Sequence, residues 1–161
     1  MKNIIKILLL TGTFFCACAG TLFAKSDFVK ELENANYLLN KNVETGAKYY
    51  IVLCSASWCG PCRKEMPQIS KTYTEKIKND KKVELVMISY DRSADDMKAW
   101  AEKEKIEFPV TLHSADEKQI FGTGTSTPGV IPQVFIFKSN GKLITSGHPA
   151  AIIGNYKKFT K

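Results

Sequence analysis

The stretch Ser57-Trp58-Cys59-Gly60-Pro61-Cys62-Arg63-Lys64-Glu65 decides the fold of this 161-residue chain. It follows an apolar run, Tyr49 to Cys54, and it begins a segment in which apolar residues recur at helical spacing. This order places Cys59 at the N-terminus of a helix and Cys62 one turn inside it. Unpaired N–H groups and the positive dipole end at that position favour a thiolate, which is the nucleophilic form of cysteine. The motif therefore predicts a nucleophile at Cys59 and a second thiol, at Cys62, placed to attack a mixed disulfide formed on the first.

A zinc site is the alternative use of two cysteines at this spacing. Structural zinc takes four ligands, commonly two such pairs or one pair with histidines. Beyond the N-terminal segment only Cys54, His113 and His148 remain as candidate ligands, and none stands at ligand spacing. We therefore predict no metal and no cofactor. We interpret Cys54 as a small core residue and assign the two histidines no role.

Two segments resemble a known family. Trp58-Cys59-Gly60-Pro61-Cys62 resembles the active site of thioredoxin-fold proteins, and Arg63-Lys64-Glu65-Met66-Pro67 is similar to the TlpA/ResA-like thiol-disulfide oxidoreductases of bacterial envelopes. Val130 to Phe137 resembles the cis-proline strand of the same fold. The resemblance implies an α/β thioredoxin fold, with a central mixed sheet and helices on both faces. It also implies an N-terminal leader helix and an inserted helix-strand unit from about Ser93 to Leu112.

The same resemblance assigns roles to residues around the cysteine pair. Cys59 and Cys62 are implied to be catalytic and to form the redox disulfide. Pro132 is implied to be cis and to lie opposite Cys59, where the backbone of Ile131 can pair with a substrate strand and metal is kept from the thiolates. The alternative is a trans proline that begins an edge strand. The implied substrate-binding positions are Trp58, Gly60, Pro61, Ile131 and Pro132.

Glu65 is the third residue with an implied catalytic role. In the envelope family a glutamate three residues after the second cysteine assists proton transfer at the dithiol, and Glu65 stands at that offset. Thioredoxins instead use an aspartate six residues before the first cysteine, which here is Leu53. The alternative for Glu65 is a solvated helix residue near Arg63 and Lys64, because geometry comes first in proton transfer.

Periodicity and turn signals predict a single domain over residues 47–161, behind a helix and linker over residues 25–46. The resemblance implies that this domain is thioredoxin-like. The N-terminal helix is expected from Ser26 to Asn40, with Ser26 or Asp27 as its cap. Asp91 and Arg92 end the second parallel strand, on the side of the sheet where α/β sites gather, and are expected to border the site. The expected strands are Ala47 to Cys54, Val83 to Tyr90, Phe108 to Leu112, Gln133 to Lys138 and Leu143 to Gly147. The other expected helices are Gly60 to Asn79, Ser93 to Lys105, Ala115 to Phe121 and His148 to Thr160.

The first 24 residues have the pattern of a secretory signal peptide. Lys2 and Lys6 precede an apolar stretch that ends in a small residue, Ala24, after which we expect cleavage. The alternative of an uncleaved anchor is disfavoured because the apolar core is short for a membrane span. Lipidation at Cys16 or Cys18 is also disfavoured, because the residues before each fit the lipoprotein pattern poorly. The protein is therefore expected to be periplasmic or otherwise exported.

Charge and motif together give a functional prediction. The net charge is +7, but no basic stretch is interleaved with aromatic residues, so nucleic acid is not a predicted partner. We predict an exported monomer that reduces disulfides in partner proteins and receives electrons from a membrane-bound donor. Gly60-Pro61 is the thioredoxin pairing, which is associated with potentials of about −270 mV.

Two other functions remain open at this point. One is a tryparedoxin-like electron donor to a peroxidase. The other is a non-enzymatic chaperone that handles metal or haem with its thiols. The resemblance to the envelope oxidoreductases also implies a role in cell redox homeostasis and in cytochrome c maturation.

Overall fold

The structure is a computed structural model that describes residues 26–113 and 129–161. The predicted signal peptide, with Cys16 and Cys18, lies outside the described residues. The predicted helix from Ala115 to Phe121 also lies outside them, as does most of the loop that follows it. Among the described residues, none of the helices has both the length and the apolar composition that a membrane span requires.

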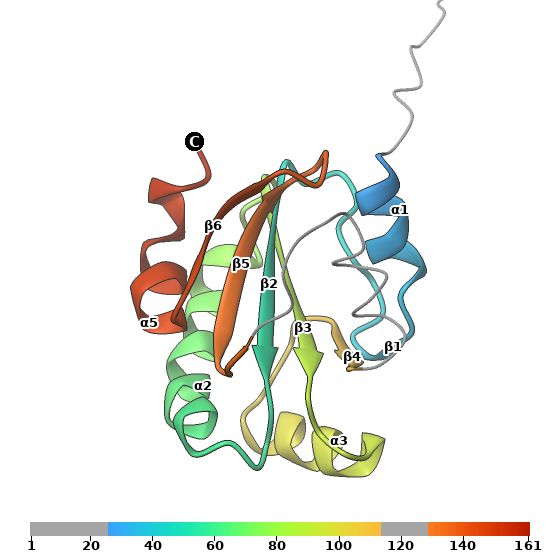
Figure 1. Ribbon diagram of the computed structural model, residues 1–161, viewed down its shortest axis with the longest axis vertical. Coiled ribbons are helices and arrows are strands. Elements are labelled where there is room, and N and C mark those ends of the chain that lie inside the picture. Colours follow the sequence, from blue (N-terminus) through green and yellow to red (C-terminus); the bar gives the residue numbers. More distant parts are fainter. Residues whose placement is uncertain (1–25, 114–128) are drawn as a thin grey trace, which may run out of the picture.

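Within the described residues, six strands form one mixed sheet in the order β1-β4-β3-β2-β5-β6 (Figure 1). Strands β2, β3 and β4 run parallel, β5 and β6 each run antiparallel to the preceding neighbour, and β1 pairs antiparallel with β4. The mixed sheet is the one predicted, and its long central strands come from the continuous apolar runs of the sequence. The strands are β1 (Tyr37–Leu39), β2 (Tyr49–Ser55), β3 (Val83–Ser89), β4 (Val110–Leu112), β5 (Gln133–Lys138) and β6 (Leu143–Gly147).

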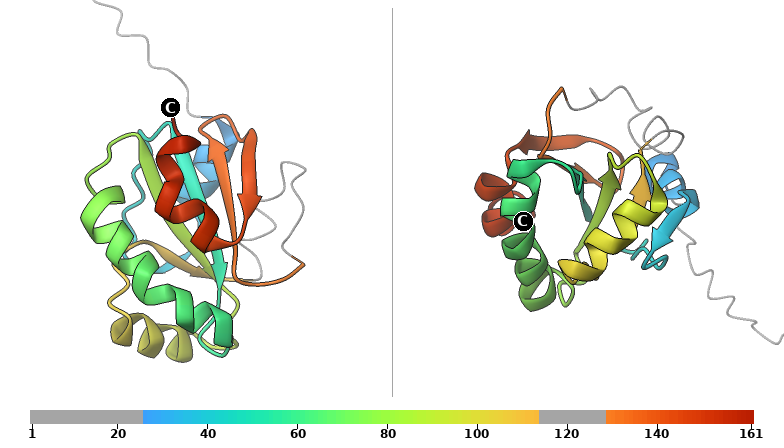
Figure 2. Two further views of the ribbon diagram at one scale, coloured as in Figure 1. Left: turned by 90° about the vertical axis from the view of Figure 1, so that its left-hand side faces the viewer. Right: turned by 90° about the horizontal axis from the view of Figure 1, so that it is seen from below.

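Helices cover both faces of this sheet, as predicted (Figure 2). Side chains along β2 alternate: Ile51 and Leu53 pack in the cluster under α2, α3 and α5, while Tyr50 and Val52 pack in the cluster under α1. The expected helix-strand insertion is present as α3 followed by β4. The helices are α1 (Asp27–Asn34), α2 (Gly60–Thr72) with a π-helical continuation (Tyr73–Ile77), α3 (Ala94–Lys103), and α5 (Pro149–Ile152) with a 3₁₀ continuation (Ile153–Lys158).

The N-terminal helix is shorter than predicted. Ser26 caps it, with its hydroxyl accepting a hydrogen bond from the Val29 N–H at 3.3 Å. The helix ends at Asn34, and residues 37–39 form strand β1 against β4. The prediction of helix to Asn40 was therefore wrong for residues 35–40. Apolar residues at helical spacing continue through Leu39, but the open edge of β4 offers backbone hydrogen bonds that a further helical turn would not use.

The β5–β6 hairpin joins α1 to the sheet. Its turn contains the predicted Asn-Gly pair, and Gly141 has a positive φ of 81°. A Cβ atom at Gly141 would lie 3.1 Å from the Cβ of Phe28 on α1, so this position requires glycine for two reasons. The Ser26 hydroxyl also donates to the carbonyl oxygen of Ser139. The start of the described chain is thus fixed to the hairpin turn.

Candidate active site

The cysteine pair lies where β2 passes into α2, at the carboxyl end of the parallel strands. Cys59 has extended backbone angles and is the N-cap of α2, and Pro61 occupies the first helical turn, where a missing N–H has no cost. The prediction that Cys59 stands at a helix N-terminus and Cys62 one turn inside it is confirmed. Gly60 and Pro61 are exposed at the tip of this turn.

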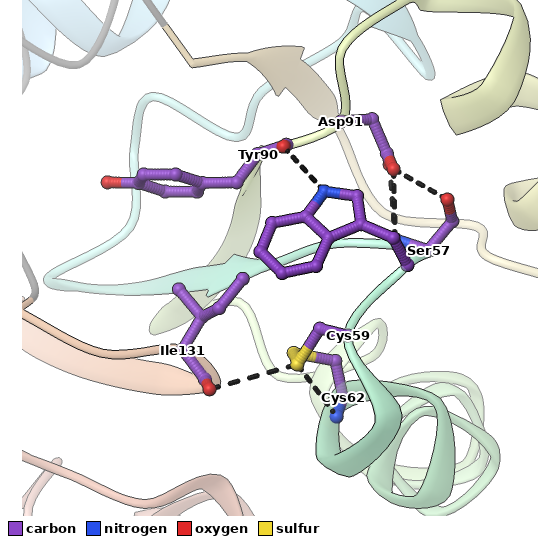
Figure 3. The surroundings of a disulfide bond; sticks show 7 residues. Ser57, Cys59, Cys62, Tyr90, Asp91 and Ile131 are labelled. Carbon is purple, nitrogen blue, oxygen red and sulfur yellow. Dashed lines mark hydrogen bonds between the residues drawn. A yellow bond between two sulfur atoms is a disulfide. The ribbon is translucent and has the colours of Figure 1, made fainter.

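Cys59 and Cys62 form a disulfide, with their Cα atoms 5.2 Å apart. The Sγ atom of Cys59 accepts a hydrogen bond from the backbone N–H of Cys62 at 3.2 Å (Figure 3). This N–H is one of the helix-terminal donors that would otherwise be unpaired, and it points at the sulfur that becomes the thiolate on reduction. Cys59 is 6% exposed and Cys62 is fully buried, so an attacking group reaches Cys59 first.

The loop before β5 lies directly against the disulfide. The Ile131–Pro132 peptide bond is cis, as predicted. The carbonyl oxygen of Ile131 lies 3.7 Å from the Sγ atom of Cys59 (Figure 3). Val130, just before it, has 71% of its surface exposed. The structure therefore brings Ile131 and Pro132 beside Cys59, and it leaves an exposed apolar residue next to them.

Trp58 lies on the surface beside the cysteine pair. Its side chain is 60% exposed, and its indole N–H donates to the carbonyl oxygen of Tyr90 at 2.9 Å. The ring of Tyr90 stacks on His113, with centroids 4.3 Å apart and planes 25° apart. The sequence alone assigns His113 no role. Its position could have been found, because Tyr90 and His113 directly follow the adjacent parallel strands β3 and β4, whose carboxyl ends meet at one edge.

Asp91 borders the site from the next strand, as predicted. Strands β2 and β3 are paired with Ser55 opposite Ser89, so the residues two positions further on, Ser57 and Asp91, emerge side by side. The Asp91 carboxylate accepts hydrogen bonds from the backbone N–H of Ser57 at 3.0 Å and from its hydroxyl at 2.6 Å (Figure 3). A hollow of about 390 Å³ next to this contact is lined by Ser57, Trp58, Asp91, Arg92 and Asp96.

Glu65 lies on the flank of α2 that faces α5. It is half-buried and lines a groove of about 280 Å³ between the two helices, together with Ile69, Pro149 and Ile153. In the described part of the chain, no hydrogen bond joins Glu65 to either cysteine. Arg63 and Lys64 on the same turn are exposed. Glu65 thus stands one helical turn beyond Cys62 in the sequence of α2, in the groove that faces α5.

Cys54 is separated from the redox pair by the sheet. It belongs to the cluster beneath α1, whereas Cys59 and Cys62 belong to the cluster beneath α2. Cys54 is fully buried, which confirms its interpretation as a core residue. Within residues 26–113 and 129–161, no three His, Cys, Asp or Glu side chains gather where they could hold a metal ion.

A cysteine pair that caps a helix, faced by a cis-proline loop on a mixed sheet, defines the thioredoxin fold. Thioredoxin from Wuchereria bancrofti has a matching structure, with a TM-score of 0.56 and 25% identity over 68% of this chain and 74% of that chain. By sequence, residues 23–146 match the model of the AhpC/TSA family, and the chain belongs to this family.

The relatives found by sequence are named thiol-disulfide oxidoreductases. The thiol-disulfide oxidoreductase ResA of Bacillus cereus is 28% identical over 88 residues, covering 55% of this chain and 47% of that protein. The chain thus spans about half the length of the Bacillus relatives that it matches. ResA of Geobacillus thermodenitrificans is 24% identical over 154 residues, covering 89% of this chain and 83% of that protein.

Proposed function

We propose that this protein is an exported thiol-disulfide oxidoreductase that reduces disulfides in partner proteins through Cys59 and Cys62. The observation that carries the proposal is the N–H of Cys62 aimed at the sulfur of Cys59 from the start of α2, beside the Ile131–Pro132 loop. The similarity to proteins named ResA supports the same chemistry.

The proposed reaction transfers two electrons. The Cys59 thiolate attacks one sulfur of a partner disulfide, forms a mixed disulfide and releases the other partner sulfur as a thiolate. Cys62, once deprotonated, then attacks the Cys59 sulfur, which closes the internal disulfide and releases the second partner thiolate. The partner disulfide is reduced to two thiols and the protein is oxidised. A membrane-bound dithiol donor is proposed to return the two electrons.

Glu65 is proposed to accept a proton during the second attack. Burial in apolar surroundings favours the neutral thiol, and Cys62 is fully buried, so a nearby base is needed to form its thiolate. Replacing Glu65 by Gln should slow the closure step and change its pH dependence while the fold is retained. Glu75, further along the same helical segment, provides a matched Gln control. A pH profile equal to that of the wild type would return Glu65 to the role of a surface residue.

Surfaces around Cys59 are proposed to receive the partner. Trp58 and Val130 are exposed beside the disulfide, and the backbone of Ile131, next to Cys59, is proposed to pair with a substrate strand. Gly60 and Pro61 complete this rim at the tip of α2. A Cys62→Ser variant should trap partners as mixed disulfides on Cys59, and a Cys59→Ser, Cys62→Ser double variant is the matched control.

A reducing couple is proposed because, among the described residues, the Cys59 sulfur accepts a hydrogen bond from the helix-terminal N–H of Cys62 and none from a cationic side chain. The residues between the cysteines are Gly60 and Pro61, and Arg63 and Lys64 face solvent, where their charges are screened. Equilibrium titration in glutathione or dithiothreitol buffers should give a potential near that of thioredoxin, about −270 mV. A value more positive than about −180 mV would instead indicate an oxidase or isomerase.

Export is proposed from the sequence of the first 24 residues. The mature protein is proposed to begin near Lys25 and to act as a monomer, with residues 47–161 as its thioredoxin-like domain. N-terminal sequencing of the protein from fractionated cells tests this directly. An intact Met1 in the cytosolic fraction would contradict it.

A further inference from the structure

A buried carboxylate lies behind the active-site turn and has no role in the thiol chemistry proposed above. Asp91 is 8% exposed and accepts three donors: the N–H of Ser57 at 3.0 Å, the hydroxyl of Ser57 at 2.6 Å and the hydroxyl of Ser89 at 2.7 Å. The N–H of Asp91 in turn donates to the Ser89 hydroxyl at 3.2 Å. Burying a carboxylate costs free energy unless hydrogen-bond donors surround it. Loss of any one of these donors would therefore make the burial of Asp91 less favourable.

Ser57 connects this carboxylate to the reacting sulfur. It stands two residues before Cys59, in the turn that joins β2 to α2. The position of that turn determines whether the Cys59 sulfur meets the N–H of Cys62 at 3.2 Å and stays 3.7 Å from the carbonyl oxygen of Ile131. Asp91 fixes the turn from outside, because it belongs to the end of β3 rather than to the segment that carries the cysteines (Figure 3).

We propose that Asp91 is a positioning residue for thiol-disulfide exchange, which acts through Ser57 to hold the Cys59 sulfur against the N-terminus of α2. This inference rests on the proposed function of Cys59 and Cys62. The feature of Asp91 that matters is its capacity to accept hydrogen bonds from Ser57. Its negative charge acts in the opposite direction, since a nearby carboxylate disfavours a thiolate.

These two properties predict opposite results when Asp91 is replaced by Ala. Loss of a neighbouring negative charge would favour the Cys59 thiolate and lower the pH midpoint of its alkylation. Loss of the turn's anchor would move the sulfur away from the helix N–H and raise that midpoint. We expect the midpoint to rise by about half a unit or more, because hydrogen bonds to the charged form favour that form. An Asp91→Asn variant keeps an oxygen acceptor for Ser57 and should remain close to wild type.

The experiment measures two quantities on the reduced, folded protein. One is the rate of Cys59 alkylation by iodoacetamide as a function of pH, and the other is kcat/KM for reduction of insulin disulfides. Asp91→Ala should lower kcat/KM by about tenfold, as expected when a reacting group is displaced by part of an ångström. Ser57→Ala should shift both readouts in the same direction by less. It should add nothing in the Asp91→Ala background.

Asp95→Ala is the matched control. Asp95 is an exposed carboxylate in the first turn of α3, four residues from Asp91, and its removal changes the charge equally without touching the turn. Both readouts should equal those of the wild type. Thermal unfolding of each variant shows which of them are folded under the assay conditions. If Asp91→Ala fails to fold, Ser57→Ala alone must still raise the midpoint.

Several results would overturn the proposal. A fall of the midpoint in Asp91→Ala would assign the effect to charge. A midpoint raised as far by Asp91→Asn as by Asp91→Ala would show that an oxygen acceptor for Ser57 is not the feature that matters. A loss of thermal stability with an unchanged midpoint and unchanged kcat/KM would show a merely structural role. Failure of the proposed function is distinguished because wild-type insulin reduction is then absent, while the alkylation profile of Cys59 still reports on Asp91.

Discussion

Two buried carboxylates stand at opposite ends of β3, and they serve different parts of the molecule. Asp91, 8% exposed, follows the carboxyl end and accepts hydrogen bonds from Ser57 beside the disulfide. Glu84, 6% exposed, lies at the amino end and accepts from the N–H groups of Glu44 and Leu85, each at 2.8 Å. Burial does not distinguish the two carboxylates. The hydrogen-bond donors distinguish them. Asp91 accepts from Ser57 in the turn before Cys59, whereas Glu84 accepts from Glu44 in the linker before β2.

The amino-end carboxylate also titrates abnormally. Burial raises the pKa of Glu84 above its ordinary value of 4.5, against the lowering effect of its two N–H donors, and the nearby charge of Glu44 raises it further. Burial likewise raises the pKa of Tyr73 to about 12, with Glu84 contributing. Glu84 near the amino end of β3 and Tyr73 in the π-helical continuation of α2 thus have surroundings that disfavour their ionised forms.

The largest effect on activity should come from a substitution at the carboxyl end of the parallel strands, where the cysteine pair lies. Replacing Cys59 by Ser should reduce insulin reduction by more than about a thousandfold, because the attacking thiolate is lost. Cys54→Ala is the matched control, since Cys54 lies on the opposite face of the sheet and its removal should leave the rate unchanged. Activity of Cys59→Ser within about tenfold of wild type would place the nucleophile elsewhere.

Glu84→Ala should have its effect on stability alone. It leaves the buried N–H groups of Glu44 and Leu85 without their acceptor, which should lower the free energy of unfolding by about 1–3 kcal/mol. Urea unfolding measures that change, and kcat/KM for insulin reduction should stay at the wild-type value. A parallel fall in kcat/KM would show that the two ends of β3 are coupled.

Trp58→Phe should have a smaller effect, confined to the carboxyl end. It removes the indole N–H that donates to Tyr90 and should lower kcat/KM about fivefold, the value of one neutral hydrogen bond. Trp100→Phe is the matched control, because Trp100 is a buried residue of α3. That variant should change stability and leave kcat/KM unchanged. Equal kinetic effects of the two substitutions would remove Trp58 from the proposed partner surface.

The smallest effect concerns pH. Because the pKa of Glu84 is raised in the folded state, the folded protein holds this proton more tightly than the unfolded chain does. Stability should therefore fall as pH rises from 4.5 through the raised pKa. The difference in urea unfolding between wild type and Glu84→Gln, followed from about pH 4 to pH 7, isolates this contribution. A difference that does not vary with pH would contradict a raised pKa.

Local chemistry made much of this molecule predictable. The positions of Cys59 and Cys62 follow from an apolar strand that runs into a helical pattern, whereas the cis state of Pro132 was implied by the resemblance of Val130 to Phe137 to a strand of a known family. The paired central strands followed from uninterrupted apolar runs, such as Val83 to Ser89. In each case the information lies within a few neighbouring residues.

Features that depend on strand order were harder to predict. The hydrogen bonds of Ser57 to Asp91 join residues 34 positions apart and require the register of β2 on β3. The stacking of Tyr90 on His113 requires β4 to lie beside β3. Strand β1 was missed because the spacing of apolar residues suits a helix as well as a short edge strand. Only the partner strand decides between the two.

The anchoring of α1 to the β5–β6 hairpin places the start of the described chain at the end of the sheet opposite the disulfide. Ser26 bonds to Ser139 at the turn of that hairpin, and the Tyr49 hydroxyl donates to the carbonyl oxygen of Lys161 at the same end of the sheet (Figure 1). The disulfide lies at the other end, where β2 meets α2. An affinity tag or surface linker attached ahead of Ser26 or after Lys161 would therefore hold the domain from behind, with Cys59 directed away from the support.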